Sequence, residues 1–566
     1  MLNDSPAARS ANHIAPGFRS STAPFGSASH AARLPMHVLF IIHCLLRIGG
    51  LGWNIEHHTA FSRPPETVPT YHVDEALLVE SMRTDFRLFS SYALVADGPL
   101  TANLIYVPLA AAGERPPLHW RPAHALVTGR LVAAISACLA FPVLWLLLAE
   151  LGVGKGMSLL ALAVLTFAPN EVFNAHFARS HTLANLLQLV VLLATAKLLA
   201  ESTRRNRCTW FAIATFAAIM AGSARYPFLT LGLFPAAGAI VLFVRSARSG
   251  QLFQETAALG LAGGAALLVG LLFGFDLRPA EILRKGFAAQ AAVGQFPWAD
   301  LHGIAISARA KFLSVFDFPG GTVRWVLALA APFAVLGRWP ADKGDRSRWM
   351  AALVLAWAAL YLALWAKFSV PWQRYSIPLS TALLVCGAMG LDRVAAWTAR
   401  RLDRGQLRVA TSVAAALLLA PAAFFCALML HRFMADTTNP LYELSIALRD
   451  EPKRQIFVHG FWQWNKPLLD VMPPDRFTLR FVPSMQDACA VANEGDLLVN
   501  FVFEPLRGSC VRHGLTPVFH ASNLGWPGFP YSREHDTAPW SRRHYEDYHY
   551  LFEEVTVFRF VASHDR

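Results

Sequence analysis

The sequence predicts a mainly α-helical polytopic membrane protein with about eleven transmembrane helices, followed by a small α/β domain at the C-terminal end. The first observation is composition, because 54% of the residues are hydrophobic and 16% are charged, whereas soluble proteins carry about 25% charged residues. The second is that apolar stretches of roughly 20 residues, the length that crosses a bilayer, recur between residues 36 and 431. The third is the change after residue 431 to short apolar runs between polar segments.

The N-terminal part begins with a polar tail and continues into the first span. Residues 1–33 are rich in Ser, Ala, Pro and Gly without periodicity, which predicts a disordered cytoplasmic tail. The transmembrane domain covers residues 34–431, and its first span, 36–53, is interrupted by Arg47. Residues 54–121 are then expected to form a long first external loop.

Ten further apolar stretches complete the predicted transmembrane domain. They are residues 122–150, 156–175, 181–201, 209–224, 227–245, 256–275, 322–338, 349–367, 374–392 and 408–431. Between 275 and 322 lies a second long external connection, whose aromatic residues indicate an ordered segment at the membrane surface.

The distribution of basic residues predicts the orientation. With the N-terminus in the cytoplasm, the predicted inner loops carry the basic clusters, as the positive-inside rule requires. The odd number of spans then places residues 432–566 outside the cytoplasm, which for a bacterial inner membrane is the periplasm. The net charge of +12 is therefore assigned to orientation, and the absence of a compact basic domain with interleaved aromatics argues against nucleic-acid binding.

The C-terminal 432–566 segment is predicted to be an extracytoplasmic α/β domain. Residues 456–458, 496–502 and 555–561 have the character of buried strands, and residues 487–492 that of a helix. Cys489 and Cys510 lie here, and outside the cytoplasm they could form a disulfide or stay reduced.

The first candidate catalytic group is the pair Asp74 and Glu75, which opens an amphipathic run ending near Phe89. Leu78 and Met82 share its apolar face, so the run is expected to lie flat at the membrane surface. Asp74 can act as a general base towards an acceptor hydroxyl, while Glu75 orients it or holds a divalent cation. The alternative is an acidic first turn that is stabilised by the helix dipole.

Two groups of basic and aromatic residues lie at other predicted outer turns. His176, Arg179 and His181 stand between the third and fourth spans, where they could bind phosphate or form a polar cap on a helical hairpin. Arg225 lies between the fifth and sixth spans, and the turn before the tenth span contains Lys367, Arg374 and Tyr375. Interfacial anchoring explains the tyrosine but not an outer arginine. Together these groups suit an anionic lipid headgroup that a hydroxyl attacks.

In this order, the motifs resemble the GT-C superfamily of polytopic glycosyltransferases, most closely the branch of protein O-mannosyltransferases and lipid A aminoarabinose transferases. The matching segments are residues 71–75 (Tyr-His-Val-Asp-Glu), 129–134 (Gly-Arg-Leu-Val-Ala-Ala), 176–183 and 374–379 (Arg-Tyr-Ser-Ile-Pro-Leu). The Pro-Pro-Leu stretch that many members carry before the second span is reduced here to Pro99-Leu100, with a separate Pro116-Pro117-Leu118.

The resemblance implies an integral-membrane glycosyltransferase that uses a polyprenyl-phosphate sugar donor. It would transfer a hexose or pentose to a hydroxyl of a cell-envelope glycan, lipid or protein on the outer face. Asp74 would be the base and Glu75 its support, while Arg179, Arg225, Arg374 and Lys367 would bind the donor phosphate, assisted by His176, His181 and Tyr375. The alternatives are a lipid or solute transporter or flippase, which the absence of repeats disfavours, and a non-catalytic assembly subunit.

Overall fold

The computed structural model describes most of the bundle and the core of the C-terminal sheet. The described residues are 30–52, 75, 78, 79, 82, 98–114, 122–292, 295–297, 299–316, 321–337, 344–368, 373–399, 404–435, 444, 446–452, 454–459, 475–482, 485–501, 513–522 and 554–562.

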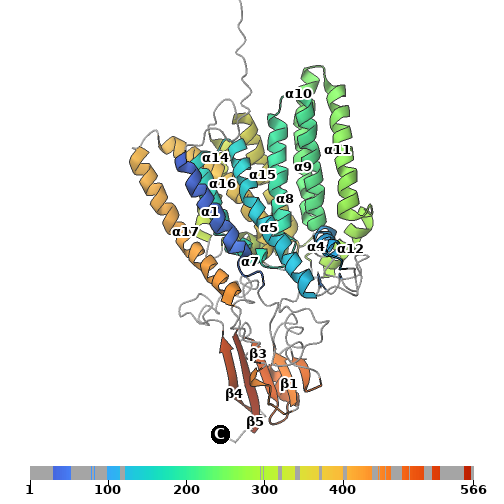
Figure 1. The fold of residues 1–566 in the computed structure, drawn as a ribbon, viewed down its shortest axis with the longest axis vertical. Helices are drawn as coiled ribbons and strands as arrows, with labels where there is room; N and C mark the ends of the chain where they lie inside the picture. Colours follow the sequence, from blue (N-terminus) through green and yellow to red (C-terminus); the bar gives the residue numbers. More distant parts are fainter. Residues whose placement is uncertain are drawn as a thin grey trace, which may run out of the picture.

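A bundle of long apolar helices forms the larger part of the molecule (Figure 1). Within the described residues, eight helical segments are long and apolar enough to cross a membrane, and a bent pair makes a ninth if it is one span. The helices of these eight segments are α5 (Pro122–Glu150), α8 (His181–Ala200), α9 (Arg204–Ala224), α10 (Leu233–Arg248, after η1, Tyr226–Gly232), α11 (Leu252–Phe275), α15 (Gly344–Ala366), α16 (Ile377–Thr398, after η2, Gln373–Ser376) and α17 (Arg404–Ala435).

The remaining helices of the bundle are shorter or broken. The bent pair is α6 (Lys155–Thr166) and α7 (Pro169–Ala175), which meet at an angle of 55°. Shorter apolar helices are α1 (His30–Ile48), α4 (Pro99–Ala111) and α14 (Gly321–Leu336). The membrane-protein fold class is thus confirmed. Helices lie at all eleven predicted spans, but those at the first and eighth are among the shorter ones, so the number eleven stays a prediction.

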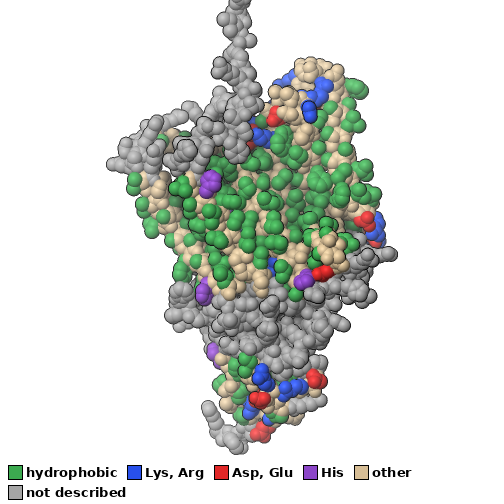
Figure 2. Space-filling model, in the orientation of Figure 1, with side chains coloured by type: hydrophobic (Ala, Val, Ile, Leu, Met, Phe, Trp, Pro, Cys, Tyr) green, Lys and Arg blue, Asp and Glu red, His purple; other side chains and the backbone are tan. Residues whose placement is uncertain are grey.

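Small residues bring the helices close together in the centre of the bundle. A Cβ atom at Gly390 of α16 would lie 1.9 Å from the backbone oxygen of Ala330 in α14, so only glycine allows this approach. Around this contact, a large apolar core contains residues of α5, α6, α8, α9, α14, α15 and α16. The outer surface of the same helices is apolar as well, and Figure 2 shows hydrophobic side chains in a broad band across the bundle.

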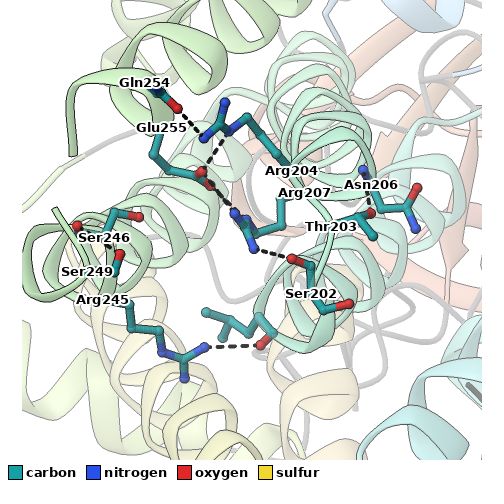
Figure 3. A network of polar contacts seen from close by, with 11 residues as sticks. Ser202, Thr203, Arg204, Asn206, Arg207, Arg245, Ser246, Ser249, Gln254 and Glu255 are labelled. Atoms are coloured by element: carbon teal, nitrogen blue, oxygen red, sulfur yellow. Dashed lines mark hydrogen bonds and ion pairs between the residues drawn. The ribbon is translucent and has the colours of Figure 1, made fainter. Parts of the chain in front are cut away.

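Basic residues gather at the end of the bundle away from the sheet. Arg207 of α9 donates from Nε and Nη2 to the two carboxylate oxygens of Glu255 in α11, at 2.7 and 2.9 Å, and Arg204 lies 3.4 Å from the same carboxylate (Figure 3). Glu255 is fully buried. The ends of α9 and α11 are therefore joined by an ion-pair network, on the side where the sequence places the cytoplasm.

The C-terminal part contains a five-stranded sheet with the order β2-β1-β3-β5-β4. Its elements are β1 (Arg454–His459), β2 (Phe477–Val482), α20 (Met485–Val491), β3 (Leu497–Phe501), β4 (His513–Ser522) and β5 (Glu554–Ala562). β1 pairs in parallel with β2 and β3, while β5 pairs antiparallel with β3 and β4. Cys489 is disulfide-bonded, and Cys510 lies outside the described residues.

Some elements of the fold were not predicted. β4 carries Pro517 and a register shift at Pro517/Phe519, so its alternation is irregular. The second external loop contains two helices, α12 (Pro279–Ala292) and α13 (Leu301–Ser314). In the run after Asp74, Leu78, Val79 and Met82 are helical, as expected. They are fully buried against α4 and α5, so this described part of the apolar face packs on protein, which corrects the expectation that it lies on lipid. The location of the run at the membrane surface stays a prediction.

Candidate functional site

Several of the predicted phosphate-binding residues come together at the end of the bundle nearest the sheet. His181 is the first residue of α8, Arg225 joins α9 to η1, and Arg374 belongs to η2. We call Arg179, Arg225 and Arg374 the arginine cluster. All three are buried, with exposures of 3%, 4% and 6%.

His181 and Tyr375 lie among these arginines. Nη1 of Arg225 is 2.9 Å from Nε2 of His181, and its guanidinium carbon lies 4.7 Å from the centre of the Tyr375 ring. The Tyr375 ring also meets the His181 ring edge-on at 5.6 Å and lies 5.8 Å from the guanidinium carbon of Arg374. Because a guanidinium only donates, Nε2 of His181 accepts and the ring proton belongs on Nδ1.

The arrangement concentrates positive charge in a buried place. The charges of Arg225, Arg374 and Arg179 all act on the His181 ring. Buried charges at the end of a membrane bundle are costly and are typical of a binding site for an ion or a headgroup. Guanidinium groups match the oxygens of phosphate with paired hydrogen bonds. The cluster can therefore bind a phosphate group.

Glu75 lies in a fork of hydrogen bonds beside this cluster. Arg130 of α5 donates to its two carboxylate oxygens at 3.0 and 2.7 Å, and the backbone N–H of Ala178 donates to Oε1 at 2.6 Å. Glu75 and Arg130 are both fully buried. Asp74 lies outside the described residues.

The short segment 176–181 connects the two groups. Ala178 contacts Glu75, and Ser180 and His181 contact Arg225. Gly129 lets α5 approach this segment, because a Cβ atom there would lie 2.5 Å from that of Ala178. The fold therefore brings Glu75 and Arg225 of the arginine cluster into contact with one tight turn.

His176 has a structural position in this turn. Its Nδ1 lies 2.8 Å from the oxygen of Val172, its Nε2 lies 2.8 Å from the oxygen of Gly49, and its ring stacks on Phe433 at 3.8 Å. Burial lowers the pKa of His176 to about 4, and the hydrogen bonds to the two carbonyl oxygens oppose this shift. These contacts join α1, α7 and α17, as the polar-cap alternative expects.

Lys367 is placed differently from the arginines. It follows α15, and its backbone oxygen accepts a hydrogen bond of 2.8 Å from Phe296. Nearby, Lys311 of α13 is buried and donates from Nζ to the oxygens of Trp365, at 2.5 Å, and Phe368. Burial lowers the pKa of Lys311 to about 7.

Arg130 contacts Glu75 but was not predicted from the sequence as a site residue. The available signal was that it is an ionisable residue within a long apolar stretch, which requires a partner. Arg130 and Ala178 make three hydrogen bonds to the two carboxylate oxygens of Glu75. Within the described part of the chain, no group of three or more His, Cys, Asp or Glu residues is arranged to hold a metal ion.

Comparisons with known proteins return solved structures only, since no family model and no curated protein matches. ArnT from Cupriavidus metallidurans in the apo state matches with a TM-score of 0.44 and 16% identity, over 83% of this chain and 92% of that one. The same protein bound to undecaprenyl phosphate matches with a TM-score of 0.44 and 14% identity, over 94% and 98%. The Saccharomyces cerevisiae protein O-mannosyltransferase Pmt1-Pmt2 complex bound to the sugar donor matches with a TM-score of 0.35 and 16% identity, over 44% and 34%.

Proposed function

We propose that this protein is a GT-C-type glycosyltransferase that transfers a sugar from a polyprenyl-phosphate donor to an acceptor hydroxyl. The acceptor would be a cell-envelope glycan, lipid or protein on the outer face of a bacterial inner membrane. The N-terminus would then be cytoplasmic, and the 432–566 domain would lie in the periplasm.

The observation that carries this proposal is the shared turn at residues 176–181. It contacts Glu75, the neighbour of Asp74, and it also contacts Arg225 of the arginine cluster. A base and a phosphate site at one end of an apolar bundle are what attack on a membrane-anchored phosphosugar needs.

In the proposed reaction, the acceptor oxygen forms a bond to the anomeric carbon of the sugar. The bond from that carbon to the phosphate oxygen breaks, and the polyprenyl phosphate leaves with the electron pair. Asp74 takes the hydroxyl proton, and the arginine cluster stabilises the negative charge on the departing phosphate. Glu75, fixed by Arg130 and Ala178, anchors the loop that carries Asp74.

The test is transfer or release of sugar from a synthetic polyprenyl-phosphate sugar by the purified full-length protein. Asp74→Asn keeps the size and most of the capping ability of aspartate but cannot take a proton. We expect it to lower turnover at least about a hundredfold, since general base catalysis contributes about 10²–10⁴-fold, with membrane insertion and yield near normal. We expect Glu75→Gln to lower turnover less. If Asp74→Asn keeps wild-type turnover, Asp74 is not the catalytic base.

The rival reading is a transporter or flippase. It predicts that the wild-type protein moves the lipid between leaflets of a vesicle while the sugar stays attached to the phosphate. The same synthetic donor, reconstituted in vesicles, distinguishes the two functions by whether the glycosidic bond is broken.

A further inference from the structure

A second set of buried polar side chains lies near η2, on the helices α7, α8 and α16. Glu171 lies in α7, Asn185 and Gln188 lie in α8, and Thr381 lies in α16. We call these four residues the anchor network. Their exposures are 6%, 2%, 0% and 1%.

The network makes hydrogen bonds to the first turns of α16, which follow η2. Oγ1 of Thr381 donates to Oδ1 of Asn185 at 2.7 Å, and Nε2 of Gln188 donates to the backbone oxygen of Pro378 at 3.1 Å. From α15, the hydroxyl of Tyr361 donates to the backbone oxygen of Tyr375 at 3.1 Å.

Glu171 determines how the side-chain amide of Asn185 is oriented. The amide nitrogen of Asn185 lies 3.5 Å from Oε2 of Glu171, which leaves its oxygen to accept from Thr381. An amide between a carboxylate and a hydroxyl has one satisfied orientation. The adjacent Asn170 also reaches η2, with its Nδ2 3.4 Å from Oγ of Ser376.

We infer that the anchor network positions Arg374 and Tyr375 for the donor phosphate, through hydrogen bonds that fix the start of α16. This inference rests on the proposed function and adds to it a set of positioning residues. η2 has only four residues, so its own backbone does little to fix the direction of a long arginine side chain. The bonds at Tyr375, inside the turn, and at Pro378 and Thr381, just after it, supply that restraint.

Apolar packing alone would not need these residues. Buried amide and carboxyl groups cost free energy unless they are fully hydrogen-bonded, and apolar side chains of similar size would pack the same helices. The polar groups converge on the one turn that presents Arg374, and η2 contacts α7 as well as α16. Hydrogen bonds fix the orientation of the groups that they join, whereas apolar packing alone does not.

Thr381 offers a matched pair of variants for the test. Thr381→Val keeps the shape and deletes the hydroxyl, whereas Thr381→Ser keeps the hydroxyl. The control is Ser347→Ala, which removes a different buried hydroxyl near the basic end of the bundle. That hydroxyl donates to the backbone oxygen of Leu151 at 2.9 Å. The probe is a short polyprenyl phosphate without sugar, titrated into the full-length protein in lipid nanodiscs.

We expect Thr381→Val to weaken binding of this probe about five- to tenfold, the effect of one lost buried hydrogen bond. Thr381→Ser and Ser347→Ala should bind like wild type. In turnover assays the valine variant should raise the donor KM and leave kcat nearly unchanged. Gln188→Met deletes only the bond to Pro378, and we expect the same weaker binding and raised donor KM. This variant replaces Thr381→Val in the test if the valine variant does not fold.

Two results would overturn the inference in distinguishable ways. Wild-type affinity in folded Thr381→Val or Gln188→Met, with weakened binding in Arg374→Ala, would show that the network is only structural while the phosphate site stands. Equal binding by wild type and Arg374→Ala would remove the phosphate site itself, and the inference with it.

Discussion

At the scale of single residues, Arg374 of the arginine cluster is held in place by its surroundings. Arg374 is 6% exposed and faces the Tyr375 ring, so its position is fixed before any ligand binds. A guanidinium held in this way has lost its rotamer freedom in advance, which lowers the cost of binding.

Replacing Arg374 tests this role directly. We expect Arg374→Ala to raise the donor KM about 10- to 100-fold, because a hydrogen bond to a charged group is worth about 1.5–3 kcal/mol. Arg374→Lys should restore only part of the affinity, since an ammonium lacks the planar fork. Steady-state kinetics with varied donor measures both. An unchanged KM in both variants would exclude Arg374 from the site.

The pair of Glu75 and Arg130 makes a prediction about stability. Arg130→Ala leaves a carboxylate buried without its guanidinium and should cost about 3–5 kcal/mol of stability. The double variant Glu75→Gln with Arg130→Met should recover much of this loss, because no charge is left uncompensated. Thermal unfolding in detergent gives the comparison. Equal melting temperatures for wild type and Arg130→Ala would contradict the buried pair.

At the scale of elements, α14 and α16 approach each other closely at Gly390. Since a Cβ atom at Gly390 would lie 1.9 Å from the oxygen of Ala330, Gly390→Ala must separate the helices or strain their backbones. We expect a lower melting temperature and a lower yield of folded protein.

Gly264→Ala in α11 is the matched control, because its added Cβ would meet nothing within 4 Å. Alanine has the higher helix propensity, so this variant should be neutral or slightly more stable. If both alanine variants unfold at the same temperature, the close approach of α14 and α16 is not required.

The sequence predicted most of these elements because their signals are local. An apolar stretch of the right length identifies a span without knowledge of its neighbours, which is why the long helices were found. The pairing of Glu75 with Arg130 joins residues 55 positions apart, and no local pattern reports such a contact. The break between α6 and α7 was missed for a related reason, since residues 156–175 are apolar enough to read as one span.

At the scale of the whole molecule, the basic loops that are predicted to be cytoplasmic lie at one end, and the arginine cluster and the sheet lie towards the other. Figure 1 shows the turn between α10 and α11 at the end opposite the sheet, and Figure 2 shows Lys and Arg side chains there. The disulfide at Cys489 agrees with an oxidising compartment around the sheet.

This polarity predicts the side on which the C-terminus lies. A reporter that is active only outside the cytoplasm, fused after Arg566, should be active. The same reporter placed in the turn at Gly250, between α10 and α11, should be silent. Activity at Gly250 and silence at the C-terminus would reverse the assigned orientation.

The stacking of His176 on Phe433 has a consequence for biosynthesis. Phe173 and Phe177 of the same early segment also contact Phe433, which belongs to the last helix of the bundle and leaves the ribosome more than 250 residues later. Chains are made from the N-terminus at about 5–20 residues per second, so nearly half of the chain must be made after α7 before Phe433 can cover it. We expect a chain truncated before α17 to leave the turn after α7 uncovered, whereas one truncated after α17 can close it.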